Sequence, residues 1–302
     1  TQSYLSVDVS RGNMRYYRIQ RDESVSLVAE DDDGAYDLTA TDPEPTSFME
    51  LADAASLTDQ SVDDVARQHL DDAPSVDRET VHENLIRPVD PDEVWGAGVT
   101  YAISQESREG EGGLEEAYIG AYEGDRPEVY FKGTPTRTVG PDDNVGIRGD
   151  SNWDVPEPEF TMILHDGDIV GYTVGNDVCS RDIERDNLLY LPQSKIYDKS
   201  CAIGPCVVTE ETIGDPHDVE MTLTIERDGD VAFTESTSTN QMVRTCDELA
   251  EFFRRYNYVP ESTALLTGTS IIPPDDFTLE EGDLVSIEIE NVGTLRNPVE
   301  QL

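Results

Sequence analysis

The chain contains 302 residues, with 65 acidic side chains against 21 basic ones and a formal net charge of −44. Low apolar content combined with high charge is typical of disordered chains, but strand-like apolar runs recur here and exclude that class. No apolar run approaches the roughly 18 residues of a membrane span, and no basic cluster exists to bind nucleic acid. We expect a soluble protein with no membrane or nucleic-acid partner, and the opening TQSYLSVDVS does not resemble a signal peptide.

The basic residues are unevenly divided, because 18 are arginine and only Lys132, Lys195 and Lys199 are lysine. A surface rich in acids and poor in lysine repels itself in dilute buffer, whereas about 1 M salt shortens the Debye length to roughly 3 Å and screens that repulsion. An acidic protein that seeks a basic partner would instead carry one acidic tail, but acids here run from Asp8 to Glu300. The composition therefore favours a halophilic, high-salt cytoplasm.

Residues 1–90 are predicted to form a small N-terminal α+β domain. Alternating apolar residues predict short strands over residues 1–40, and the pattern becomes helical from Thr46 to Leu70. Thr46 or Ser47 can cap a first helix and Ser61 a second, which has acids in its first turn. The polar segment DDAPSVD is typical of an exposed loop, and we place the domain boundary near residue 90.

Residues 91–302 are predicted to form a second domain that is mostly β-structure. Only two helices are expected, over residues 113–118 and 247–254. The candidate strands are EVWGAGVTY, VYFKG, FTMILHDG, DIVGYTVGND, SCAIGPCVVT, DVEMTLTIERDG, DVAFTEST, STALLTGTS and DLVSIEIENVGTLRNPV. Many strands and few helices indicate a β-rich α+β fold, a sandwich or roll rather than a doubly wound sheet.

Several familiar catalytic motifs are missing from the sequence. The four cysteines form no C-x-x-C pair, so neither a zinc knuckle nor a thioredoxin-like motif is present. The four histidines form no H-E-x-x-H, and no G-x-S-x-G occurs. Zinc peptidases and serine hydrolases of the nucleophile-elbow type are therefore excluded.

Three carboxylates are predicted to form a metal site. Glu157 and Glu159 lie two apart in VPEPEF, whose prolines favour an extended backbone, so both side chains point to one face. Asp177 ends the run DIVGYTVGND, which we expect to return beside the first strand as a hairpin. In so acidic a chain, an E-x-E pair commonly lies on a solvent-exposed face. Here, however, the segment with the two glutamates and the segment that ends at Asp177 both border apolar runs. Oxygen donors in this arrangement suit Mg²⁺, with Mn²⁺ as the alternative.

Lys195, in LPQSKIYD, is the second candidate for chemistry. An ammonium group can orient a carboxylate, and a lysine whose pKa is lowered by burial can take a proton from carbon beside a carbonyl. Lysines are ordinarily solvent-exposed, but in a chain with only three lysines we expect this one to have a specific role. The same argument covers Lys132 in VYFKG, whereas we expect Lys199 to be an ordinary surface residue.

These segments together resemble the fumarylacetoacetate hydrolase family. The likeness runs from about Val94 to Gly268 and rests on G-x-x-Y ending at Tyr101, Phe131-Lys132, PEPEF, GNDVCSRDIE, LPQSK-x-Y-D and TGTS. Within the family the chain is similar to archaeal 2-keto-3-deoxy-pentonate dehydratases in EVWGAGVTY, in R-x-D-S-x-W and in LYLPQSKIYDKSCAIGP. The resemblance implies a mixed β-sandwich roll as the catalytic domain, and a homodimer or homotetramer.

The resemblance also implies an activity and a set of site residues. The activity is the Mg²⁺-dependent dehydration of a 2-keto-3-deoxy sugar acid, an arabinonate or xylonate, to 2,5-dioxopentanoate in oxidative pentose degradation. The implied metal ligands are Glu157, Glu159 and Asp177. Lys195 is expected to be the base or the group that orients the substrate carboxylate, and Glu128 is the candidate for a second proton transfer. Predicted substrate contacts are Ser104, Arg108, Lys132 and Thr269.

One departure from the family pattern bears on the reaction. Hydrolytic members typically carry a histidine three residues after the G-x-x-Y tyrosine, where this chain has Ser104. That argues against hydrolysis and favours a lyase. Two alternatives stay open: an acylpyruvate- or fumarylacetoacetate-type hydrolase, or a 2-keto acid decarboxylase or isomerase. A third, an acidic binding protein without activity, predicts that the carboxylates and Lys195 do not converge.

Overall fold

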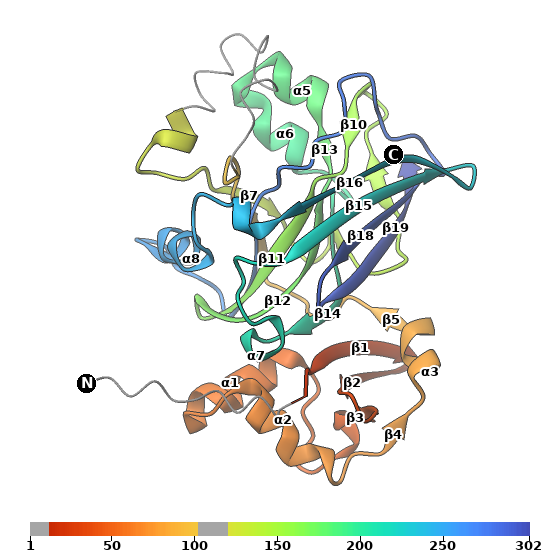
Figure 1. Ribbon diagram of the computed structural model, residues 1–302, viewed down its shortest axis with the longest axis vertical. Helices are drawn as coiled ribbons and strands as arrows, with labels where there is room; N and C mark the ends of the chain where they lie inside the picture. The colour runs from red at the N-terminus through yellow and green to blue at the C-terminus, as the bar shows by residue number, and fades with distance from the viewer. Residues whose placement is uncertain (1–11, 102–119) are drawn as a thin grey trace.

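The computed structural model describes residues 12–101 and 120–302. Figure 1 shows the N-terminal elements at one end of the molecule, with most strands of the remaining chain above them. These elements are β1 (Arg15–Arg21), β2 (Ser24–Glu30), β3 (Ala35–Asp37), η1 (Leu38–Ala40), α1 (Phe48–Thr58), α2 (Val62–Leu70), β4 (Ser75–Val76), α3 (Arg78–Glu83) and β5 (Leu85–Ile86). Both long helices begin where expected, because the side chains of Ser47 and Ser61 accept hydrogen bonds from backbone N–H groups of the first turn.

The remaining chain is rich in strands. They are β6 (Glu93–Gly96), β7 (Tyr130–Gly133), β8 (Thr138–Val139), β9 (Val145–Ile147), β10 (Asp154–Val155), β11 (Pro158–His165), β12 (Asp168–Asp177), β13 (Cys179–Ser180), β14 (Cys201–Val208), β15 (Glu220–Arg227), β16 (Asp230–Ser238), β17 (Ser262–Leu266), β18 (Leu284–Ile289) and β19 (Gly293–Gln301). Every candidate strand of residues 91–302 contains at least part of one of these, and the last contains both β18 and β19. The predicted β-rich α+β class is confirmed.

The helices among these strands are short. They are α5 (Arg181–Asp186), η3 (Leu188–Tyr190), α6 (Leu191–Lys195), α7 (Glu210–Ile213), η4 (Thr239–Gln241) and α8 (Cys246–Arg254). The sequence predicted α8, which begins at the capping box of Thr245 and Glu248. The helix expected over residues 113–118 lies outside the described residues. Across the two described ranges, no helix is long and apolar enough to cross a bilayer.

One large sheet runs through the molecule. Its order is β4-β3-β2-β1-β14-β12-β11-β17-β6-β7, with β5 beside β1 and β8 beside β14. Strand β11 is buried at every residue, which explains its continuous apolar run. Phe160, Met162 and Leu164 face one core, and Ile163 between them belongs to the other. This central position makes β11 a firm support for the residues at its start.

A second layer packs on each face of the large sheet. A five-stranded sheet, β16-β15-β18-β19-β9, contributes Leu223, Ile225 and Ile287 to the core that holds Phe160. On the opposite face, α1 and α2 contribute apolar side chains to the core that holds Ile163. The two sheets together form the mixed β-architecture that the sequence indicated.

The N-terminal unit is joined to the rest of the chain through the sheet. Strand β1 pairs with β14, with Arg15 opposite Val208 and Tyr16 opposite Val207. The sheet is therefore continuous across residue 90, and a division of the chain into domains at that point stays a prediction.

A buried carboxylate reinforces this junction. Asp63 of α2 is fully buried, and its two oxygens accept hydrogen bonds from the hydroxyl of Tyr16 at 2.7 Å and from that of Thr209 at 2.8 Å. Thr209 directly follows β14, so the carboxylate connects α2, β1 and the end of β14. Burial raises the pKa of Asp63.

We expect Asp63→Ala to lower the free energy of unfolding by about 2–4 kcal/mol, because it leaves two buried hydroxyl groups without their acceptor. Denaturant unfolding in concentrated KCl, followed by circular dichroism, measures the change. Asp72→Ala removes an exposed acid nearby and is the matched control. Equal stabilities of the two variants would contradict the role of Asp63.

Candidate active site and metal centre

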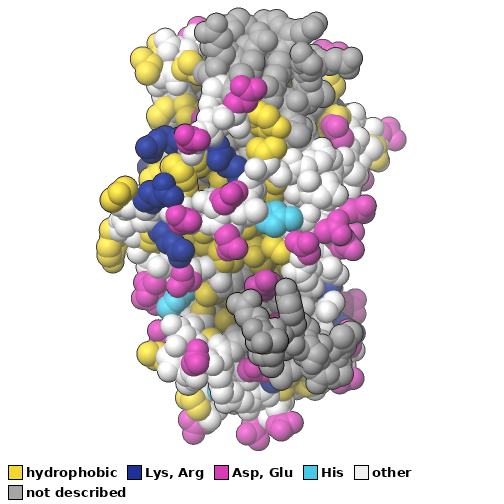
Figure 2. Space-filling model, turned by 60° about the vertical axis from the view of Figure 1, so that its left-hand side comes forward, with side chains coloured by type: hydrophobic (Ala, Val, Ile, Leu, Met, Phe, Trp, Pro, Cys, Tyr) yellow, Lys and Arg dark blue, Asp and Glu magenta, His cyan; other side chains and the backbone are white. Residues whose placement is uncertain are grey.

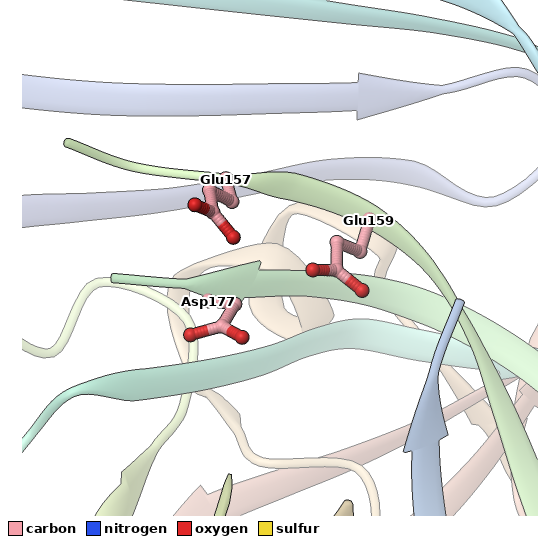
Figure 3. A group of neighbouring side chains, drawn as sticks. All are labelled: Glu157, Glu159 and Asp177. Carbon is pink, nitrogen blue, oxygen red and sulfur yellow. The ribbon is translucent and has the colours of Figure 1, made fainter. Parts of the chain in front are cut away.

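The three predicted metal-ligand carboxylates meet where the β11–β12 hairpin opens. The N–H of Glu157 donates to the carbonyl of Asp177 at 3.2 Å, and the N–H of Asp177 donates to the carbonyl of Glu157 at 2.9 Å. Glu159, two residues into the same extended segment, points to the same side. Ligand oxygens of the three residues lie within 4.8 Å of one another, and Figure 3 shows the carboxylates facing a common space.

The carboxylates are held by donors from three other segments. The backbone N–H of Gly268 donates to Glu159 Oε2 at 2.5 Å, and Gly268 has a φ of +83° just after β17. A Cβ at this position would lie 2.3 Å from the hydroxyl of Thr100, so only glycine fits this approach. The hydroxyl of Tyr130, on β7, donates to Asp177 Oδ2 at 2.5 Å.

Lys195 closes the site from the end of α6. Its side chain is almost fully buried, and its Nζ lies 2.5 Å from Glu157 Oε2 and 3.3 Å from Asp177 Oδ2. Burial alone would lower the pKa of Lys195, but the negative charges of Asp177 and Glu157 raise it well above its usual value. The lysine is therefore a charged ammonium at neutral pH. The carboxylates and Lys195 converge, so the prediction made by the binding-protein alternative is wrong.

The electrostatics of the site fit a divalent cation. Burial, followed by the charges of Asp177 and Glu157, raises the pKa of Glu159 well above its usual value. Burial would also raise the pKa of Asp177, but Lys132 and Lys195 lower it. A divalent cation among these oxygens would relieve the repulsion that Glu159 feels, and carboxylate oxygens are the donors that Mg²⁺ and Mn²⁺ prefer.

Glu128 lies beside this centre. Its carboxylate occupies the space in front of Gly98, where a Cβ would lie 2.0 Å from Glu128 Oε2. Desolvation raises the pKa of Glu128 to about 7; Lys195 opposes this shift, and Glu184 and Glu157 add to it. Glu128 can therefore both accept and donate a proton near neutral pH.

The predicted substrate contacts have different positions. Thr269 is half-buried and follows Gly268, next to the backbone that holds Glu159. Lys132 is fully buried, and its ammonium contacts oxygens of Asp177, Val178 and Lys195. These protein oxygens surround its ammonium, and a contact between Lys132 and the substrate stays a prediction. Ser104 and Arg108 lie outside the described residues, so their roles stay predictions.

Sequence reasoning missed Tyr130 as part of the site, and it missed the contact between the N–H of Gly268 and Glu159. Tyr130 precedes Lys132 by two residues on β7, so the period of a strand places both on one face. That alternation was the available signal for Tyr130. For Gly268 the signal was weaker, since a glycine after an apolar run indicates a tight turn without indicating which acid its N–H meets.

Comparison with known proteins agrees with this geometry. The family model described as fumarylacetoacetate (FAA) hydrolase C-terminal matches residues 94–300. The chain belongs to the fumarylacetoacetate hydrolase family, and the resemblance inferred from its motifs is confirmed.

Individual relatives are more informative. The chain is 52% identical over 286 residues to a probable 2-keto-3-deoxyxylonate dehydratase of Haloferax volcanii, covering 95% of this chain and 99% of that protein. It is 43% identical over 222 residues to the 2-dehydro-3-deoxy-D-arabinonate dehydratase of Saccharolobus solfataricus, covering 72% and 74%. A solved 2-keto-3-deoxy-D-arabinonate dehydratase, complexed with magnesium and 2,5-dioxopentanoate, superposes with a TM-score of 0.82 at 34% identity, covering 96% of this chain and 99% of that one.

We expect Glu128→Gln to change how stability depends on pH in the metal-free protein. A carboxyl with a pKa of about 7 in the folded state and 4.5 when unfolded stabilises the fold below pH 4.5. That contribution is lost as pH rises to 7, because the unfolded chain releases the proton first. The neutral amide escapes this loss, so the stability of the variant relative to wild type rises over this range, by at most about 3 kcal/mol.

Unfolding by denaturant at a series of pH values measures this difference. Glu123→Gln, at an exposed position on the same segment, is the control. A stability difference between Glu128→Gln and wild type that stays constant from pH 4.5 to 7 would contradict the shifted pKa of Glu128.

Proposed function

We propose that this protein is a Mg²⁺-dependent hydro-lyase that dehydrates a 2-keto-3-deoxy-pentonate, an arabinonate or xylonate, to 2,5-dioxopentanoate. The observation that carries the proposal is the buried centre of Glu157, Glu159, Asp177 and Lys195, in a chain 52% identical over nearly its whole length to a probable dehydratase of this class. The solved relative with magnesium and 2,5-dioxopentanoate supports both the cofactor and the product.

The residues suit a reaction that begins beside a keto group. A Mg²⁺ held by the three carboxylates would act as a Lewis acid toward a 2-keto acid and make its C3 proton more acidic. The ammonium of Lys195, charged and fixed by Glu157 and Asp177, attracts the substrate carboxylate and stabilises negative charge that develops near it. Because its ammonium is fixed by these two carboxylates, we favour this orienting role over that of a base.

Glu128 suits the proton transfers. The C4 hydroxyl leaves together with a proton from C3. This step releases one water and leaves a double bond between C3 and C4. Transfer of a proton from C5 to C3 then gives an enol with a double bond between C4 and C5. Loss of the proton of its C5 hydroxyl, with protonation of C4, gives the C5 aldehyde. With a pKa of about 7, Glu128 can take a proton in one step and return it in another. Thr269, together with Ser104 and Arg108, is proposed to contact the substrate.

A second reaction of the same family rests on a specific observation. An oxaloacetate tautomerase of Xenopus laevis is 25% identical over 313 residues, covering 95% of this chain. Tautomerisation also begins with loss of a proton beside a keto group, so the same centre suits it. Hydrolysis is disfavoured, because it needs a base that activates water and Ser104 replaces the histidine of hydrolytic members.

We also propose a cellular setting, on the basis of the charge and of one relative. The net charge of −44 and the Haloferax relative support a halophilic archaeon with a high-salt cytoplasm as the source. We also propose a homodimer or homotetramer, as the resemblance to the family implies.

Turnover tests the proposed function directly. We expect purified protein in concentrated KCl to convert 2-keto-3-deoxy-xylonate or -arabinonate to 2,5-dioxopentanoate, detected through a coupled aldehyde dehydrogenase. Chelation should abolish the product and added Mg²⁺ should restore it. Tautomerisation of oxaloacetate without any dehydration of either pentonate would reject the dehydratase and support the second candidate.

Two substitutions test the centre itself. We expect Glu159→Gln and Lys195→Met each to reduce kcat by more than about 100-fold, a loss that substitution of outer-shell residues at metal sites already reaches. Glu159→Gln should also weaken Mn²⁺ binding, measured by electron paramagnetic resonance. Lys199→Met is the matched control, since Lys199 pairs with Glu300 away from the centre. Wild-type kcat in either site variant would remove that residue from the mechanism.

A further inference from the structure

Lys132 occupies a position that the proposed reaction does not use. It lies on β7, its side chain has no exposed surface, and its Nζ lies 2.5 Å from Asp177 Oδ1. The same ammonium donates to the carbonyl of Lys195 at 2.5 Å and to that of Val178 at 3.0 Å. The buried ammonium therefore has two hydrogen bonds and one ion pair within the protein.

Strand β7 holds both oxygens of the Asp177 carboxylate. Lys132 contacts Oδ1, and Tyr130, two residues earlier on the same face, donates its hydroxyl to Oδ2 at 2.5 Å. Rotation of this carboxylate would break the ion pair of Oδ1 with Lys132 or the hydrogen bond that Oδ2 accepts from Tyr130. The orientation of this metal-ligand side chain is therefore set by β7 as well as by β12.

The other partner of Lys132 is the end of the helix that carries Lys195. The last carbonyls of a helix have no partner within it and need donors from elsewhere. The carbonyl of Lys195 receives two, from Lys132 Nζ and from the hydroxyl of Ser200 at 3.0 Å. Lys132 thus contacts the backbone of one active-site residue and the side chain of another.

We propose that Lys132 is a positioning residue that ties the Asp177 carboxylate to the backbone of Lys195, so that the metal centre and the catalytic ammonium keep one fixed separation. The proposal rests on the proposed function for the reaction that benefits. It replaces the expectation that Lys132 touches the substrate. Helix α6 has only five residues and cannot hold this separation alone.

Removing the ammonium separates positioning from substrate contact. We expect Lys132→Met to reduce kcat about 100-fold, as misplacement of catalytic groups by about 1 Å does, with KM for the pentonate unchanged. Loss of a direct substrate contact would raise KM instead, and that result would overturn the proposal. Lys199→Met is the matched control and should keep wild-type kcat and KM.

Lysine-selective NMR provides a readout that does not depend on turnover. The chain has three lysines, so ¹³Cε-labelled lysine gives three signals, each assigned by the Lys→Met variant that removes it. We expect Lys132→Met to shift or split the Lys195 signal and to leave the Lys199 signal in place. A Lys195 signal that is unchanged in the folded Lys132→Met variant would overturn the proposal.

A measurement on the wild-type protein keeps the proposal testable if Lys132→Met does not fold. Saturating pyruvate, a 2-keto acid, added with Mg²⁺ should move the Lys195 signal more than the Lys132 signal. A larger shift at Lys132 would indicate direct contact with the ligand and overturn the proposal. Wild-type protein that does not dehydrate either pentonate would reject the proposed function alone, because the NMR measurements still report on the position of Lys195.

Discussion

The active centre depends on a balance of buried charges. Three carboxylates meet near the middle of the large sheet, and two lysines approach them from β7 and α6. Ionised carboxylates that are removed from water without partners are strongly destabilised. Although both lysines are present, burial and the charges of Asp177 and Glu157 still raise the pKa of Glu159, so part of the negative charge is not compensated. A divalent cation among the carboxylates would offset the negative charge that remains. Two of the three lysines in the chain therefore lie at this centre.

Strands and backbone hydrogen bonds surround these charged side chains. The hairpin of β11 and β12 has protein on both faces, and the paired backbone groups of Glu157 and Asp177 fix its open end. The groups that complete the site come from segments far apart in sequence, including Tyr130 on β7, Lys195 on α6 and Gly268 after β17. Catalytic groups that are held by strands and by neighbouring hydrogen bonds stay within the narrow range of positions that proton transfer requires.

The sequence predicted those parts of the site that local geometry determines. An extended P-E-P-E segment places Glu157 and Glu159 on one face whatever surrounds it, and the capping residues Ser47 and Ser61 act within their own helices. The partners of Lys132 and the helical state of α6 were beyond such reasoning. A five-residue polar helix has too few turns to show a period, and a contact between β7 and the end of α6 depends on how distant segments pack.

The pairing of β1 with β14 has a mechanical consequence. Val208, at one end of β14, lies opposite Arg15 of the N-terminal unit, and Cys201, at the other end, lies opposite Asp177. A single strand therefore connects the N-terminal unit to the residue beside a predicted metal-ligand carboxylate. Such a unit cannot swing on a hinge as an independent flap would. The strand pairing makes the N-terminal unit a direct support of the strand that lies beside the centre.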